Sequence, residues 1–208
     1  MSTSTKRKRV SEANSARNLR TTLDWRLISL AGASCWYLLF GGALARADWT
    51  QFRGPNGAGV ASDANPPVQF GPENNLLWRL EIKSGHSSPI VSGDLIFLTT
   101  FDQNEKRLSV VAIDRHRGEI RWERAVDAKE IERGHPSFNP ASSTPATDGE
   151  RVVAYFGSYG LVCFDFDGNK EWDLPLPCTK SYAGNAISPI IADDKVILYR
   201  GNFVDHFL

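Results

Sequence analysis

Short apolar runs separated by polar pairs repeat along the chain from residue 87 onward. Each copy opens on a Ser or Thr followed by Pro, in the strings SSPIV from Ser87, SSTPAT from Ser142 and ISPII from Ile187. Each opening is followed by a polar pair and a short run rich in Val, Ile, Phe and Tyr, as in GDLIFLTT, GERVVAYFGS and DDKVILYRG. Short runs of this composition, bounded by Gly and Asp, predict β-strands joined by tight turns.

A second motif closes the first two copies of the repeat. The string AIDRHRGEIRW is echoed about 50 residues later by CFDFDGNKEW, with a turn that is one residue shorter. Each string predicts a hairpin in which one strand ends at the Asp, the Asp and Gly form the turn, and the next strand carries the Trp. We expect that Trp to pack against the neighbouring repeat. The motif residues are Ala112, Asp114, Gly118 and Trp122 in the first copy and Asp165, Gly168 and Trp172 in the second.

Four short strands in a period of about 50 residues are typical of a propeller blade. The fold class that we predict is therefore all-β, a β-propeller of four-stranded antiparallel blades preceded by an N-terminal signal helix. The expected blades lie at about 87–126, 142–176 and 187–208, and the third stops before its Asp…Gly…Trp hairpin. About three blades are fewer than a closed ring contains, so we expect 48–208 to be a partial propeller and the chain to be an N-terminal fragment.

These strings resemble those of PQQ-like (quinoprotein-type) β-propeller repeat proteins of the exported bacterial type. The spacing A-x-D-x-x-x-G-x-x-x-W at 112–122 is similar to the tryptophan-docking motif of this family, and DWTQFRGPNGAG from Asp48 resembles the usual opening of its members. The resemblance covers nearly all of 48–208. It implies that the LLWRLEI segment around Trp78 is the outer strand of a blade completed elsewhere.

The first 47 residues have a different character from the repeats. They hold eight basic and two acidic residues, whereas 48–208 hold 16 basic and 22 acidic ones, so the net charge of zero hides two opposite segments. A basic start, an uncharged run from Leu27 to Ala45 and the small residues Ala45 and Ala47 predict a signal peptide at 1–47, cleaved after Ala47. The alternative is an uncleaved anchor that contacts the membrane only through 27–45. Either form places the protein in the periplasm or cell envelope.

Little in the repeats points to catalytic chemistry. The sequence contains no HxH or HxxxH metal pattern and no GxSxG nucleophile motif, so we assign no catalytic, cofactor-binding or metal-binding residue. His86 and His135 each precede a repeat opening, which leaves either a ligand contact or loop packing for them. Cys163 and Cys178 are either unpaired or joined in one disulfide. The charged run KEIERGH from Lys129 is expected to be a solvated insertion, and GPNGAG from Gly54 a surface loop.

The repeats and the resemblance together predict an exported, noncatalytic β-propeller that acts as a protein- or ligand-binding scaffold. Its expected partner is an envelope protein or a small ligand, and the acidic repeats argue against nucleic acid. The alternative is a fragment of a PQQ-dependent dehydrogenase, a quinoprotein oxidoreductase that would use PQQ with calcium. The resemblance carries no cofactor residue over to this chain, because the chain has no adjacent Cys pair and too few blades to enclose a cofactor.

Overall fold

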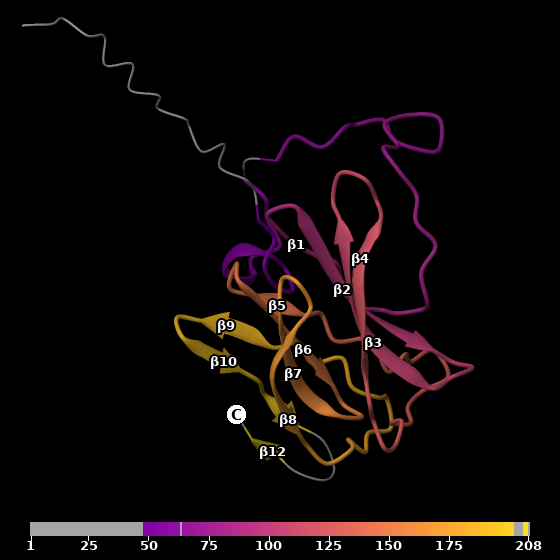
Figure 1. Ribbon diagram of the computed structural model, residues 1–208, viewed down its shortest axis with the longest axis vertical. Coiled ribbons are helices and arrows are strands. Elements are labelled where there is room, and N and C mark those ends of the chain that lie inside the picture. Colours follow the sequence, from indigo (N-terminus) through magenta and orange to yellow (C-terminus); the bar gives the residue numbers. More distant parts are fainter. Residues whose placement is uncertain (1–47, 63, 202–205, 208) are drawn as a thin grey trace, which may run out of the picture. The chain divides into compact units, whose positions relative to one another are not determined.

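A computed structural model of the protein describes residues 48–62, 64–201 and 206–207 (Figure 1). The predicted signal segment, with Ala45 and Ala47, lies outside these residues. The regular secondary structure of the described residues is almost entirely β-strand, and its one helix is the single 3-10 turn η1 (Pro55–Gly57). Within the described residues, no helix has the length and apolar character needed to cross a membrane.

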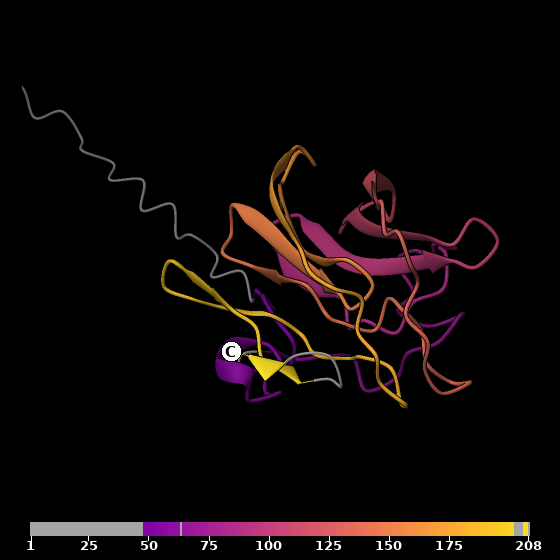
Figure 2. The same cartoon turned by 90° about the horizontal axis from the view of Figure 1, so that it is seen from below.

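Two four-stranded antiparallel sheets form successive blades, which lie side by side in Figures 1 and 2. The strands of the first blade, in order across the sheet, are β1 (Ile90–Ser92), β2 (Leu95–Asp102), β3 (Arg107–Asp114) and β4 (Ile120–Val126). Those of the second are β5 (Ala146–Thr147), β6 (Arg151–Phe156), β7 (Gly160–Asp165) and β8 (Lys170–Pro175). The predicted fold class of antiparallel four-stranded propeller blades is confirmed.

The third repeat forms two separate two-stranded sheets. One pairs β9 (Ile190–Ala192) with β10 (Lys195–Ile197), and the other pairs β11 (Arg200–Gly201) with β12 (His206–Phe207). The described chain therefore contains two complete blades and the beginning of a third. This agrees with the incomplete propeller predicted from the repeats.

The alternation of side chains along β6 joins the second blade to both of its neighbours. Val152, Ala154 and Phe156 belong to a core cluster shared with the first blade. Val153 and Tyr155, which point to the opposite face, belong to a second cluster that includes Leu198 of the third repeat. Each blade is thus buried on both faces where a neighbour covers it, which explains why the strand runs in the sequence are apolar throughout rather than strictly alternating.

The segment before the first blade departs from expectation in two ways. Residues 76–82 form no strand and pair with no strand of the described chain, and the bridge that follows them joins Ser84 to Phe101. The GPNGAG string is more than a surface loop, since Gly54 is buried beneath the Trp49 ring. Trp49 itself exchanges two backbone hydrogen bonds with Val91, at 2.8 and 2.9 Å, and so extends the first blade beyond β1.

Because successive strands are antiparallel, the loops gather at two ends of the blades. The turn end contains loops 93–94, 115–119, 148–150, 166–169 and 193–194. The connection end contains loops 103–106 and 157–159 together with the long connections 127–145 and 176–189. The two ends carry different chemistry.

Candidate functional site

The repeat motif residues lie at the turn end, where they join one blade to the next. The Trp122 indole Nε1 donates a hydrogen bond of 2.8 Å to the carbonyl oxygen of Phe166. Gly168, with φ of +83°, lies so close under the ring that an added Cβ would be 2.8 Å from Trp122 Cδ2. A residue with a side chain at this position would meet both the unfavourable backbone conformation and the ring.

The same contact occurs once more, one boundary earlier. Trp78 Nε1 donates to the carbonyl oxygen of Arg115 at 2.9 Å, and Gly118, with φ of +68°, lies under the Trp78 ring. Trp78 is thus the docking tryptophan for the first hairpin even though its segment is not a strand. Trp172, the third equivalent, is 37% exposed.

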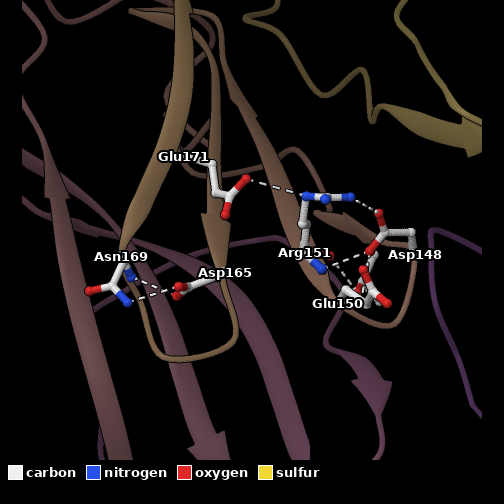
Figure 3. A network of polar contacts seen from close by, with 7 residues as sticks. Asp148, Glu150, Arg151, Asp165, Asn169 and Glu171 are labelled. Carbon is white, nitrogen blue, oxygen red and sulfur yellow. Dashed lines mark hydrogen bonds and ion pairs between the residues drawn. The ribbon is translucent and has the colours of Figure 1, made fainter.

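Asp114 and Asp165 stabilise the turns that present these glycines. Asp114 Oδ1 accepts hydrogen bonds from the backbone amides of His116 and Arg117, and these amides hold the pKa of its carboxyl below the usual value. Asp165 accepts hydrogen bonds from the side chain and backbone of Asn169, which lower its pKa in the same way (Figure 3). These acids therefore act as turn residues, and the buried Ala112 lies opposite Trp122 across the β3–β4 pair.

A polar network on the second blade lies close to this turn. Figure 3 shows the Arg151 side chain between two carboxylates, with Nε 3.4 Å from Glu171 and an ion pair of 3.3 Å to Asp148. All three side chains are at least partly exposed, so the network contributes little to stability. It forms part of the surface rather than a catalytic arrangement.

The hydroxyl residues before each opening proline connect the three repeats through their innermost strands. The Ser88 amide donates to Thr144 Oγ1 and the Thr144 amide donates to Ser188 Oγ, each at 3.0 Å. The hydroxyls of Thr144 and Ser188 therefore link neighbouring repeats.

His86, His116 and His135 do not converge on one place. His86 and His135 are exposed, and the His135 ring contacts Ser137 while the His86 amide donates to Ala141. His116, at the turn end, lies 3.0 Å from Asp94. Across the described ranges, no group of three or more His, Cys, Asp or Glu side chains is positioned to hold a metal ion.

The connection end holds two adjacent cavities, and residues of the KEIERGH segment line both of them. The first has a volume of about 660 Å³ and is formed by residues 130, 132, 133 and 178–182. The second has a volume of about 780 Å³ and is formed by residues 128–135 and 138–140 with part of the β2–β3 loop. Both volumes lie in the range of ordinary ligand pockets. Glu132 lines both of them.

Glu132 lies at the meeting point of three loops of the connection end. Its amide donates to Ser158 Oγ at 3.0 Å, and its Oε2 accepts a hydrogen bond from the Thr179 hydroxyl. The carboxyl packs directly on Gly157, whose hydrogen leaves the room that a Cβ would fill. Glu132 is 5% exposed, so the expectation that the whole charged run is solvated is wrong for this residue. Ser158 and Thr179, from two other loops, contact Glu132 and bury it.

The other carboxylate oxygen has no partner in the part of the chain that the structure describes. Oε1 of Glu132 is buried and has no hydrogen bond among the residues that the structure describes. Burial raises the pKa of Glu132 to about 7, against the opposing effects of the Thr179 hydroxyl and the Arg200 guanidinium. This carboxyl therefore changes its charge near neutral pH, which is unusual for a glutamate.

Cys163 and Cys178, the two cysteines among the described residues, are both free thiols. Cys163 is buried in the core of the second blade, and Cys178 lies partly buried on the wall of the first cavity. Burial raises the pKa of Cys163 to about 12 and also raises that of Cys178. Neither is a thiolate at neutral pH, so neither is an activated nucleophile.

Sequence reasoning missed Glu132 and Thr179 as members of one site. They are 47 positions apart, and neither belongs to a repeated motif. It also missed Asn139 and Asn185, two buried residues ahead of the second and third openings. Each accepts a hydrogen bond at its Oδ1 from the amide two residues later, as Asx turns do. An Asn two to four residues before a repeat opening is the one signal that was available.

Comparison with known families adds a match over residues 84–202, to the family model described as outer membrane protein assembly factor BamB, a model of PQQ-type repeats. The match spans 119 of the 208 residues and includes both complete blades and both cavities. No curated protein matches the chain.

Proposed function

Because the chain belongs to the PQQ-like repeat family whose model is described as outer membrane protein assembly factor BamB, we propose that it is an exported, noncatalytic scaffold that binds a polypeptide. The binding surface in this proposal is the connection end of the blades. The family description names an assembly factor, which favours binding over catalysis for this chain. The basic start and apolar run of residues 1–47 support export.

One observation supports the connection end as the binding surface. The long connections 127–145 and 176–189 meet at one end and form two adjacent cavities there, and the opposite end has only short turns. The cavity walls mix exposed charged residues with the partly buried apolar residues Ile131 and Phe138 and the exposed ring of Tyr182. Such mixed, concave surfaces on loops held by a rigid sheet are where propellers and other β-folds bind their partners.

Site-specific photo-crosslinking tests the proposal. A photoreactive phenylalanine replaces Tyr182, which is 85% exposed and lines the first cavity. The matched control replaces Tyr199, which is 60% exposed and lies on the third repeat, where it lines neither cavity. We expect the full chain, mixed with envelope extract, to give a discrete polypeptide adduct from position 182 and none from position 199.

Two outcomes would overturn the proposal. Equal labelling from positions 182 and 199, or none from 182, would remove the connection end as the binding surface. Reduction of a redox dye with simple alcohols or sugars, dependent on added PQQ and Ca²⁺, would instead identify the chain as part of a quinoprotein oxidoreductase.

A further inference from the structure

We propose that the buried carboxyl of Glu132 receives the ammonium group of a lysine side chain carried by the bound polypeptide. The inference rests on the proposed binding function and adds the chemistry that the connection end recognises. The two carboxyl oxygens of Glu132 differ in their hydrogen bonding.

The unpaired oxygen marks a position for a hydrogen-bond donor. Oε2 already accepts the Thr179 hydroxyl, whereas Oε1 is buried and unpaired among the described residues. Buried polar atoms in folded proteins almost always have a partner, so an orphaned carboxylate oxygen calls for one. Because Oε1 itself is buried, a donor supplied by a ligand in either of the two cavities that Glu132 lines reaches it only when the carboxyl turns toward that cavity.

The number of open acceptors selects the type of cation. A guanidinium binds a carboxylate best through both oxygens, and here Thr179 occupies one of them. An ammonium is a compact charge that needs only one oxygen, and it lies at the end of a narrow unbranched stem. Ile131 and Phe138 of the second cavity and Tyr182 of the first provide apolar surface against which that stem can pack.

None of the charged or titratable groups described around Glu132 replaces it as the acceptor for the ammonium group. Arg200 lowers the pKa of Glu132, but its guanidinium donates to the Tyr155 hydroxyl at 3.1 Å and to the carbonyl oxygen of Pro177, and Oε1 stays unpaired. Burial raises the pKa values of Tyr155 and Cys178, so both are neutral at pH 7. The remaining charged side chains on the cavity walls are exposed and screened by water and salt. They are Glu105, Lys106, Lys129, Glu130, Arg133, His135 and Lys180.

Binding of an ammonium must therefore displace a proton from Glu132. With the pKa of its carboxyl at about 7, most molecules carry the proton at pH 6 and few carry it at pH 8. A bound cation favours the carboxylate, so it lowers that pKa and releases the proton. Affinity for the ligand consequently rises with pH, and proton release is largest on the acid side.

Titration calorimetry of the full chain tests this chemistry with two peptides that differ only in charge, acetyl-Gly-Lys-Gly-amide and its norleucine analogue. We expect the lysine peptide to bind about tenfold more tightly at pH 7. Titrations in two buffers of different ionisation heat should show proton release at pH 6 and almost none at pH 8. Glu132→Gln should abolish both the preference and the proton release. The matched Glu119→Gln, which changes an exposed carboxylate at the turn end, should abolish neither.

Further controls distinguish a failure of the lysine assignment from a failure of the proposed binding function. His135→Gln should retain the pH dependence, which assigns the titration to Glu132 rather than to the imidazole on the cavity wall. Equal affinity for the two peptides, or wild-type binding without proton release, overturns the inference without recourse to a variant that might misfold. If an adduct still forms from position 182 in that case, the binding function stands and only the lysine assignment fails. If neither is seen, both proposals fail.

Discussion

The two boundaries of the second blade are built from the same motif but are packed differently. At the boundary with the first blade, Trp122 is 6% exposed, bonded to the Phe166 carbonyl and tilted against the Phe97 and Phe164 rings. At the boundary with the third repeat, Trp172 occupies the equivalent position and is 37% exposed. The tryptophan is encoded in both repeats, but its burial depends on the hairpin that the next repeat supplies.

The second boundary adds polar contacts toward the connection end to the apolar cluster that contains Leu198. Thr179, in the connection to the third repeat, donates to Glu132 through its hydroxyl and to the Gly157 carbonyl through its amide at 2.8 Å. Arg200 of β11 is 1% exposed and bonds to Tyr155 of β6. The first boundary therefore has a buried docking tryptophan, whereas the second combines the apolar cluster around Leu198 with buried polar groups, one of which titrates near neutral pH.

The largest expected contrast is between the two tryptophans. Trp122→Ala removes a buried ring between two sheets and should lower the free energy of unfolding by about 3–5 kcal/mol. Trp172→Ala removes a partly exposed ring and should cost about 1 kcal/mol. Urea unfolding of the full chain, followed by circular dichroism, measures both. Similar losses for the two variants would show that the boundaries are packed alike after all.

The second boundary should respond to pH through Glu132. The folded pKa of about 7 lies above the unfolded value of 4.5, so the native state binds more protons between these values and its stability falls as pH rises through that window. The difference in unfolding free energy between wild type and Glu132→Gln should therefore change by about 3 kcal/mol between pH 4.5 and 7.5, to the disadvantage of the wild type. Urea titrations at four pH values measure this difference. A constant difference would contradict a buried, titrating carboxyl.

Two glycines with similar φ allow the cost of a ring contact to be measured apart from the cost of backbone strain. Gly168 and Gly149 have φ of +83° and +98°, but only Gly168 lies under a ring, and a Cβ on Gly149 would have no atom within 4 Å. Gly168→Ala should therefore destabilise the protein by about 1–3 kcal/mol more than Gly149→Ala, which pays only the backbone cost. Thermal and urea unfolding of the pair give the number. Equal losses would mean that the ring moves aside without cost.

The smallest contrast concerns a side chain that only the first boundary uses. Arg124 Nε donates to the Gly168 carbonyl at 2.7 Å and its guanidinium lies 5.7 Å from the Trp122 ring centre, whereas the second blade has Leu174 in this position. Arg124→Leu should cost about 1 kcal/mol, and Leu174→Arg should change stability by less than about 0.5 kcal/mol. A measurable gain from Leu174→Arg would show that the third repeat already presents an acceptor there.

Much of the fold follows from local chemistry that recurs in every repeat. Apolar runs between Gly and Asp predict the strands, and Asp114 with Gly118 predicts a turn whatever surrounds it, because side-chain capping and a positive φ are local properties. The same reasoning fails for residues 76–82, since a strand needs a partner and the described chain does not supply one. It also fails for the GPNGAG string. Gly54 packs under the ring of Trp49, and the backbone of Trp49 pairs with Val91 of β1, which lies about 40 positions later in the sequence.

The amino-acid sequence by itself therefore determined the repeat, the antiparallel blades and the turns that present each docking glycine. Only the tertiary structure decided which tryptophan is buried and which glutamate lies between the cavities. Glu132 belongs to a run of charged residues that reads as solvated, and it is buried because loops 26 and 47 positions away close over it. Burial and pKa depend on those distant neighbours, so a local pattern does not encode them.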